Sequence, residues 1–353
     1  MYIIVALIII VLPIVFDQTD LSMDTKNRLY LFVSGVILVL LTGLRSYTVG
    51  ADTDNYLASF ETVKDSDFIQ LVMRIRTSMN IETRDPFYDV FVKVFQTVIS
   101  ADYRMYMFFI GIAFTVPLLI WIYRYSTDYR LSLLVYICMF FSFYGTTGYR
   151  QTLATAIIVL IGDKYIRNKK IVPFAILTVI AFLFHRSALV FFPFYFLSRI
   201  RITKRFILSV FVFEVIAFIF KNQLSDFFKY ISGYGEMYTG QYEGAGTWTL
   251  TTALIAILFF TMLFKTQIMS NDEYSQMNIN AVVLAIVFLP LTFVNPSALR
   301  VVMYFELYLV FHMKSLIYGF TEKSRPFAYA AICLLLILLC VKSGVNYSFM
   351  WQF

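Results

Sequence analysis

Residues 171–188 read IVPFAILTVIAFLFHRSA, a stretch of fourteen uncharged positions followed directly by His185 and Arg186. A helix of that length is about 21 Å long, against a membrane hydrocarbon core of roughly 30 Å. The stretch is apolar enough for lipid, yet it is short, so it predicts that the charged turn lies below the membrane surface. Charged residues at that depth are costly unless they face a watery cavity or bind an anion.

The rest of the chain has the same character. Of its 353 residues 60% are hydrophobic and 14% are charged, and the mean hydropathy is +0.75. Soluble domains carry roughly 45–50% apolar and about 25% charged residues, so a soluble globular protein is excluded. We predict an all-α polytopic membrane protein, a single integral membrane domain over residues 1–353 with about twelve spans. The runs are 2–16, 29–44, 105–123, 131–146, 149–163, 171–184, 187–198, 206–220, 248–264, 280–294, 298–318 and 327–342.

The net charge of +7 predicts topology and not nucleic-acid binding, because the cations lie between apolar runs. With the N-terminus outside, sixteen Lys and Arg residues fall at inner loops and span ends, and six fall at short outer ones. The remaining seven lie in one long segment, 45–104, which is long enough to escape the positive-inside rule. This asymmetry predicts that both termini lie outside.

Two outer segments are expected. The first, 45–104, separates the second and third spans, and Asp85-Pro86 offers an N-cap followed by proline at the first helical position. Apolar residues then recur at helical spacing, which predicts an amphipathic helix near 86–100 that lies in the interface or dips into the membrane. The second, 221–247, places five glycines among tyrosines and predicts a mobile lid.

Four charged motifs stand at the outer ends of spans and can converge on one recessed, cationic site. Arginine forks suit phosphate oxygens, so Arg150, Arg186 and Arg300 predict a substrate with a pyrophosphate head and a long apolar tail. The alternative is that these arginines snorkel to lipid headgroups or pair with Asp52, Asp54 or Glu306. The motifs are Arg45 to Tyr56, Gly148-Tyr149-Arg150-Gln151, His185-Arg186-Ser187-Ala188 and Asn295-Pro296-Ser297-Ala298-Leu299-Arg300.

His185 is the candidate general base, because imidazole accepts protons near neutral pH; a purely structural role is the alternative. Asp52-Thr53-Asp54 is a DxD triplet of the kind that holds a divalent metal in nucleotide-sugar enzymes. Nucleotide sugars are not available on the outer face, so we favour a carboxylate that orients His185, pairs with Arg45 or hydrogen-bonds a sugar hydroxyl. No metal or other cofactor is expected.

At these residues the chain resembles the EpsG-like group of Wzy-type bacterial polysaccharide polymerases. Arg45, Gly50, Asp52 and Tyr56 match the R-x4-G-x-D-x3-Y signature of that group. The resemblance continues, in order, through the motifs at Arg150 and His185 and ends at Arg300 with Tyr304. Together these pieces span about three quarters of the chain.

The resemblance implies a GT-C-like, membrane-embedded, metal-independent glycosyltransferase of the bacterial cytoplasmic membrane, with its active site facing outward. Its donor would be the growing glycan on undecaprenyl pyrophosphate, and its acceptor the non-reducing end of a second lipid-linked repeat unit. A chain-length regulator and a flippase of the same pathway are possible partners. A lipid-linked oligosaccharide flippase or other transporter, a membrane acyltransferase and a glycan ligase are the alternative functions.

The same resemblance implies roles for individual residues. Arg150 and Arg300 would bind the donor pyrophosphate, and Arg45 and Arg186 would support that site or bind the acceptor pyrophosphate. His185 would deprotonate the acceptor hydroxyl, with Asp52 orienting it or replacing it as the base. The remaining expected substrate contacts are Tyr56, Tyr149, Asp54, Gln151 and Tyr304.

Overall fold

The computed structural model describes residues 1–77, 85–224, 226, 247–293, 296–342 and 346–352. These residues form helices and no strand, and one isolated bridge joins Arg45 to Phe349. The α-helices of the first half are α1 (Tyr2–Asp17), α2 (Met23–Gly43), α3 (Thr53–Asp65), α4 (Phe68–Thr77), α5 (Pro86–Val98), α6 (Tyr103–Tyr125), α7 (Tyr129–Val135), α8 (Phe141–Tyr144), α9 (Tyr149–Thr155), α10 (Asp163–Arg167) and α11 (Ile171–Phe184).

The α-helices of the second half are α12 (Phe194–Leu197), α13 (Lys204–Ile219), α15 (Trp248–Leu263), α16 (Lys265–Asn271), α17 (Ser275–Val287), α18 (Leu289–Thr292), α19 (Leu299–Glu306), α20 (Leu309–Ile317) and α21 (Arg325–Lys342). Four short segments have tighter or wider turns. Two are π-helical, η1 (Tyr136–Phe140) and η2 (Ala156–Ile161), and two are 3₁₀ turns, η3 (Arg186–Phe191) and η4 (Pro296–Ala298).

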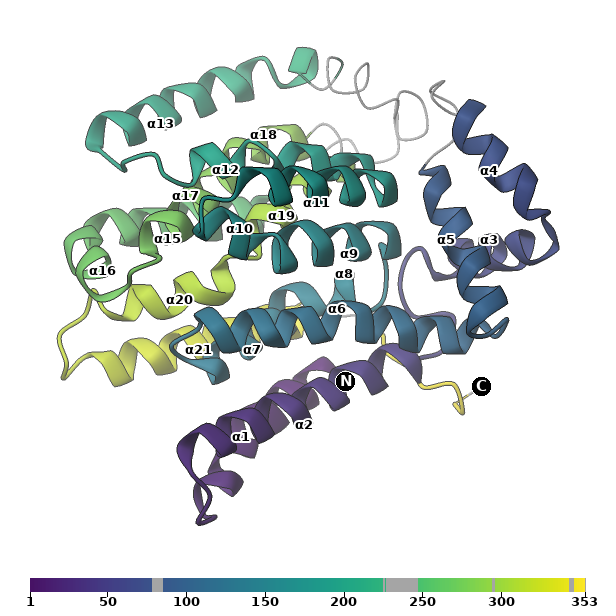
Figure 1. Ribbon diagram of the computed structural model, residues 1–353. Helices are drawn as coiled ribbons and strands as arrows, with labels where there is room; N and C mark the ends of the chain where they lie inside the picture. Colours follow the sequence, from purple (N-terminus) through teal and green to yellow (C-terminus); the bar gives the residue numbers. More distant parts are fainter. Residues whose placement is uncertain (78–84, 225, 227–246, 294–295, 343–345, 353) are drawn as a thin grey trace.

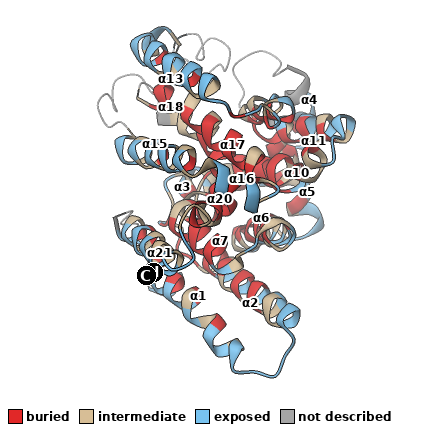
Figure 2. Cartoon of the chain, turned by 90° about the vertical axis from the view of Figure 1, so that its left-hand side faces the viewer, coloured by how far each residue is buried: buried red, intermediate tan, exposed pale blue. Residues whose placement is uncertain are grey.

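The axes of most long helices are roughly aligned, and α3, α4 and α5 gather at one end of the bundle (Figure 1). The buried residues concentrate in the middle of the molecule, while α1, α13, α15 and α21 carry many exposed residues (Figure 2). On α13, for example, Leu208, Phe211 and Ile219 are each more than 60% exposed. Exposed apolar faces of this extent are typical of helices that contact lipid, and the chain is a membrane protein.

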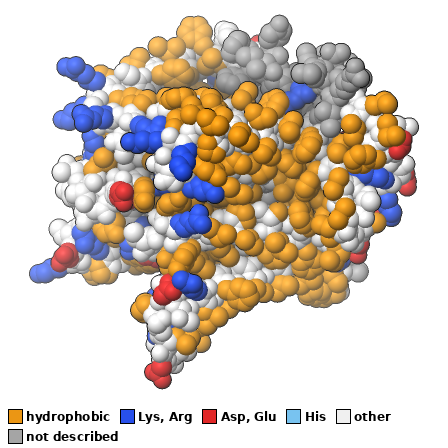
Figure 3. All heavy atoms as spheres, viewed as in Figure 1, with side chains coloured by type: hydrophobic (Ala, Val, Ile, Leu, Met, Phe, Trp, Pro, Cys, Tyr) orange, Lys and Arg blue, Asp and Glu red, His pale blue; other side chains and the backbone are white. Residues whose placement is uncertain are grey.

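Charge is distributed unevenly along the bundle. On the face seen in Figure 3, Lys and Arg side chains gather toward the left-hand end, away from α3, α4 and α5, and hydrophobic side chains cover much of the remainder. The predicted topology places most Lys and Arg residues on the inner side of the membrane and the segment 45–104 on the outer side. The observed arrangement agrees with it, because that segment lies at the end of the bundle opposite the cluster of cations.

The number of spans stays a prediction. Among the described residues, three helices are long and apolar enough to cross a membrane, by length and composition: Met23–Gly43, Tyr103–Tyr125 and Ser275–Thr292. A fourth is possible if Trp248–Leu263 and Lys265–Asn271, bent by 80°, form one span. The other apolar helices have 10–17 residues, among them α11, whose fourteen residues occupy the stretch 171–184.

The segment 45–104 folds into α3, α4 and α5 in the part that the structure describes. Helix α5 occupies residues 86–98, where the sequence predicts an amphipathic helix near 86–100. Pro86 begins this helix as expected, but the Asp85 side chain makes no capping hydrogen bond, because Asp85 has left-handed backbone angles (φ 45°, ψ 56°). Asp85 thus stands at the predicted N-cap position, but its carboxylate contacts His185 instead of a backbone amide of α5. The second expected outer loop, 221–247, lies mostly outside the described residues.

The described C-terminal residues return to the segment that follows α2. The Ser46 amide donates a hydrogen bond to the Ser348 carbonyl (2.8 Å), and the Met350 amide donates one to the Leu44 carbonyl (3.0 Å). The Tyr347 hydroxyl donates to the Leu41 carbonyl at 2.5 Å. The start of the Arg45 motif is thus supported by the other end of the sequence.

Candidate functional site

Arg45 is completely buried and holds its motif together. Its guanidinium donates to the Val49 carbonyl, to the Thr53 hydroxyl (2.9 Å) and to the hydroxyl of Tyr149, which begins α9. Between these partners Gly50 has φ +100°, and a Cβ there would lie 2.0 Å from the Thr146 carbonyl oxygen. A glycine is required at such a position. Arg45 therefore fixes the motif against α9 and leaves no exposed surface for a substrate.

His185 and Asp85 form a buried pair. The His185 Nδ1 lies 3.1 Å from Asp85 Oδ2, and Asp85 Oδ1 accepts a hydrogen bond from the Arg186 amide at 3.3 Å. Both side chains are less than 5% exposed. We expected Asp52 to orient His185 or to replace it as the base, but the carboxylate that contacts His185 in the structure is Asp85.

The charge state of Asp85 follows from its neighbours. Burial raises the pKa of the Asp85 carboxyl, but the hydrogen bond and charge of His185, the charge of Arg150 and the Arg186 amide together hold it below its ordinary value of 3.8. An ionised Asp85 favours the tautomer of His185 that carries its proton on Nδ1. The Nε2 atom of His185 is buried and has no hydrogen-bond partner within the described ranges.

Aromatic packing of α5 against the end of α11 positions Asp85 next to His185. Phe87 and Phe91 stand one turn apart on α5, and their rings meet the Phe184 ring edge to face at 5.2 and 5.1 Å. Phe184 ends α11 immediately before His185. Edge-to-face aromatic pairs are favourable and directional, so this cluster fixes the distance between the start of α5 and the end of α11.

Arg150 lies on the other side of Asp85. Its guanidinium is 3.8 Å from Asp85 and 4.0 Å from Asp89, and it lies over the Tyr88 ring at 5.0 Å. The Arg150 side chain is 21% exposed. At these distances the two ion pairs are longer than direct hydrogen bonds.

Arg300 approaches the same region from α19. Its guanidinium is 3.7 Å from Asp52, with 27% of the Arg300 side chain exposed. The Gln151 side-chain amide donates to the Arg300 carbonyl at 2.6 Å and so ties α19 to α9. Arg150 and Arg300 are therefore attached to neighbouring positions of one scaffold, and each lies near a carboxylate.

Aromatic and hydroxyl side chains complete the cluster. The Tyr56 and Tyr149 rings are stacked with centroids 4.8 Å apart, and the Tyr56 hydroxyl accepts a hydrogen bond from the Arg150 amide at 3.4 Å. Burial raises the pKa of the Tyr56 phenol to about 12, so it remains a neutral hydroxyl. Tyr304 is buried, and its hydroxyl lies 3.1 Å from the Ser187 hydroxyl.

The structure thus brings together Arg45, Asp52, Tyr56, Tyr149, Arg150, Gln151, His185, Arg186, Arg300 and Tyr304, which the sequence nominates, through the contacts above. Asp54 is exposed in the first turn of α3. Asp52 of the DxD triplet pairs with Arg300. Within the described part of the chain, no group of three or more His, Cys, Asp or Glu residues is placed to hold a metal ion.

Sequence reasoning missed the parts of the site that α5 supplies, namely Asp85, Tyr88 and Asp89. The available signal was Asp85-Pro86 at the start of an amphipathic helix. That signal locates the helix but not its partner, because His185 lies 100 residues further along the chain.

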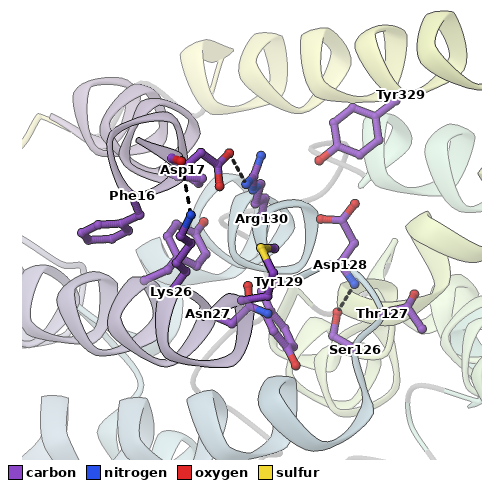
Figure 4. A pocket seen from close by; sticks show the side chains of 13 residues that line it. Phe16, Asp17, Lys26, Asn27, Ser126, Thr127, Asp128, Tyr129, Arg130 and Tyr329 are labelled. Atoms are coloured by element: carbon purple, nitrogen blue, oxygen red, sulfur yellow. Dashed lines mark hydrogen bonds and ion pairs between the residues drawn. The ribbon is translucent and has the colours of Figure 1, made fainter. Parts of the chain in front are cut away.

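A polar cavity away from these residues lies where α1 joins α2 and α6 joins α7, and it has a volume of about 740 Å³. Its charged side chains have partners within the protein (Figure 4): Arg130 lies 3.1 Å from the Asp17 carboxylate, and Lys26 donates to the Asp17 backbone carbonyl at 3.2 Å. Asp128 likewise pairs with Lys314 at 3.1 Å. This cavity contains none of the motif residues, so the cluster around Asp85 and Arg150 is the candidate site.

Comparison with known proteins identifies the family. The sequence model of the EpsG family matches residues 28–353, nearly the whole chain. No curated protein and no solved structure matches the chain. The matched range contains every residue of the candidate site, and the family indicates a polysaccharide-polymerase-like glycosyltransferase. The chain belongs to the EpsG family.

Proposed function

We propose that the protein polymerises undecaprenyl-pyrophosphate-linked oligosaccharide repeat units on the outer face of the bacterial cytoplasmic membrane. It transfers the growing glycan to the non-reducing end of an incoming lipid-linked unit. The observation that carries this proposal is the arrangement of two partly exposed arginines, Arg150 and Arg300, beside the buried His185–Asp85 pair. The two arginines suit the binding of a pyrophosphate, and the His185–Asp85 pair suits proton abstraction from a hydroxyl.

These positions support the following reaction. An acceptor hydroxyl attacks the anomeric carbon of the donor sugar and forms the new glycosidic bond, while the bond from that carbon to the pyrophosphate oxygen breaks. The hydroxyl proton goes to His185 Nε2, and Asp85 stabilises the resulting imidazolium, as the aspartate does in a catalytic triad. Arg150 and Arg300 stabilise the negative charge that develops on the departing undecaprenyl pyrophosphate.

The carboxylates give the arginines a resting partner. Asp52 at 3.7 Å from Arg300, and Asp85 and Asp89 near Arg150, balance the cations before substrate arrives. A pyrophosphate offers both arginines bidentate, charge-assisted hydrogen bonds, which are shorter and stronger than these pairs. Tyr56, whose ring stacks on the fully buried Tyr149, is itself only half-buried and can contact a sugar beside the site.

The decisive experiment supplies purified protein with lipid-linked repeat units and no nucleotide sugar. We expect a ladder of longer lipid-linked glycans, and an EDTA arm should give the same ladder because no step uses a metal. Transport of intact units without extension would assign the chain to the flippases, and transfer only to a non-repeating acceptor would make it a ligase. Either result, or dependence on added Mg²⁺, would contradict the proposal in that respect.

Two variants test the arginines in the same assay. Arg150→Ala and Arg300→Ala should each lower the extension rate by about 10²–10³-fold, the range found when one donor to a developing negative charge is removed. Arg28→Ala is the matched control, because it removes an arginine whose salt bridge to Asp24 is exposed and remote from the site. Wild-type rates in both site variants would remove these residues from the mechanism.

A further inference from the structure

A large apolar groove lies between α15 and α21. Its volume is about 1090 Å³, above the roughly 300–1,000 Å³ of pockets for drug-sized ligands. Helices α15 and α21 lie on the same side of the molecule (Figure 2), and Met313 and Leu316 of α20 line the groove between them. Of the described lining residues none is charged, and three carry a hydroxyl group.

The groove is long as well as wide. On α15 its lining extends from Trp248 to Phe260, and on α21 from Phe327 to Leu339. Twelve residue steps of helix correspond to about 18 Å, more than half of the roughly 30 Å hydrocarbon core. Small side chains, including Ala256 and Ala331, line both walls. Part of an extended hydrocarbon chain with methyl branches can lie along walls of this length.

The Trp248 end of the groove contacts the segment that precedes Arg300 in the chain. The Trp248 ring contacts the Phe293 ring with centroids 4.7 Å apart, and the Thr247 and Thr292 hydroxyls lie 2.5 Å apart. Thr292 ends α18, and Arg300 follows on α19, which packs against α18. A ligand with its polar head at Arg300 can therefore lead an apolar tail past Trp248 into the groove.

We propose that this groove binds the isoprenoid tail of a lipid-linked substrate whose pyrophosphate lies at Arg300 and Arg150. The inference rests on the proposed function for the chemistry of the head group, and it adds where the tail lies. In this arrangement Arg300 binds the charged end of the ligand, and the α15–α21 groove holds part of its apolar tail.

Photolabelling tests the groove without requiring polymerisation. The probe is undecaprenyl pyrophosphate with a diazirine in its tail, added to the full-length protein in detergent micelles, and the labelled peptides are mapped by mass spectrometry. We expect labels on α15 and α21, near Ala256 and Ala331. Labels confined to other helices would overturn the proposal, whatever the polymerisation assay shows.

A matched pair of tryptophan variants adds a second measurement. Ala331→Trp fills the groove and should reduce this labelling at least tenfold. Leu334→Trp places the same ring on the same helix, at a residue that is 58% exposed and does not line the groove, and should leave labelling unchanged. Equal labelling in both variants would contradict the assignment.

Competition identifies the occupant. Unlabelled undecaprenyl pyrophosphate should displace the probe, whereas phosphatidylglycerol at the same concentration should not. Equal displacement by phosphatidylglycerol would make the groove a site for ordinary membrane lipid. If wild-type labels lie elsewhere and Ala331→Trp changes the oligomeric state in detergent, the groove is a contact between copies of the chain. Absence of glycan extension with intact groove labelling would reject the proposed function alone.

Discussion

At the scale of single residues, Asp85 joins the two halves of the site, because its carboxylate contacts His185 on one side and lies near Arg150 on the other. It holds its charge in a buried position through these neighbours. In the proposed reaction Asp85 is a positioning residue, since it acts through His185 and does not itself contact the reacting atoms.

Asp85→Asn is expected to lower kcat by about 10²–10⁴-fold with little change in KM, because the neutral amide cannot stabilise the imidazolium that forms at His185. Extension kinetics with lipid-linked units measure both constants. Asp65→Asn, at an exposed position at the end of α3, is the control and should retain wild-type kinetics. A rise in KM alone would show that Asp85 binds substrate and does not position His185.

The stability of the protein should depend on Asp85 in acid. Its pKa in the folded protein lies below the ordinary value of 3.8, so its ionisation stabilises the fold above that value. This contribution is lost as the pH falls through the lower, folded-state pKa. Thermal unfolding in detergent at pH 7 and near pH 3 should therefore show a smaller acid-induced loss in Asp85→Asn than in the wild type. An identical loss in both proteins would show that the pKa of Asp85 is not lowered in the folded protein.

The sequence was sufficient to nominate most residues of the candidate site but not their pairing. His185, Arg150 and Arg300 stand out because charged groups interrupt apolar runs, and a charge in such a place demands an explanation. Asp85 does not stand out, since it lies in a segment rich in carboxylates and before a proline, where a capping role is the ordinary expectation. Its left-handed backbone conformation, which turns its side chain to His185, is set by tertiary packing.

At the scale of elements, the turn between α2 and α3 is a rigid support for the site. Gly50 sits in it with φ +100°, close to the Thr146 carbonyl, and Arg45 and Thr53 are hydrogen-bonded on either side of it. The turn therefore holds Asp52 opposite Arg300 through backbone geometry as much as through side chains.

Gly50→Ala should lower the free energy of unfolding by about 1–3 kcal/mol, the cost of holding a non-glycine residue in a strained backbone conformation. It should also reduce glycan extension, since the turn must shift away from Thr146. Unfolding titrations in mixed micelles measure the first effect. Ala51→Ser, at the neighbouring exposed position, should change neither property. Wild-type stability in Gly50→Ala would mean that the turn adapts without strain.

Element lengths were harder to foresee than element types. Apolar runs predicted helices correctly, but their periodicity does not reveal where an α-helix gives way to a π-helical or 3₁₀ segment. The run 131–146 combines α7, the π-helical η1 and α8, and the run 187–198 begins as the 3₁₀ turn η3. These local changes depend on neighbouring helices, which a single sequence does not specify.

At the scale of the whole molecule, the uneven distribution of Lys and Arg makes the orientation testable. Asp65→Cys and Asn168→Cys place a thiol at exposed positions at opposite ends of the bundle, in a background lacking Cys138, Cys333 and Cys340. In intact cells a membrane-impermeant maleimide should label position 65, whereas position 168 should react only after permeabilisation. The reverse pattern would place the candidate site on the inner face and contradict the proposed use of outer lipid-linked units.

The hydrogen bonds between the Arg45 motif and the C-terminal residues set an order of assembly. Leu41 and Tyr347 are 306 residues apart in the sequence. At a synthesis rate of roughly 5–20 residues per second, the ribosome makes the second partner about 15–60 s after the first. During that interval the newly made Arg45 motif lacks its backbone partners at Ser348 and Met350, so translation that stops before them yields a chain with all its arginines but an unsupported site.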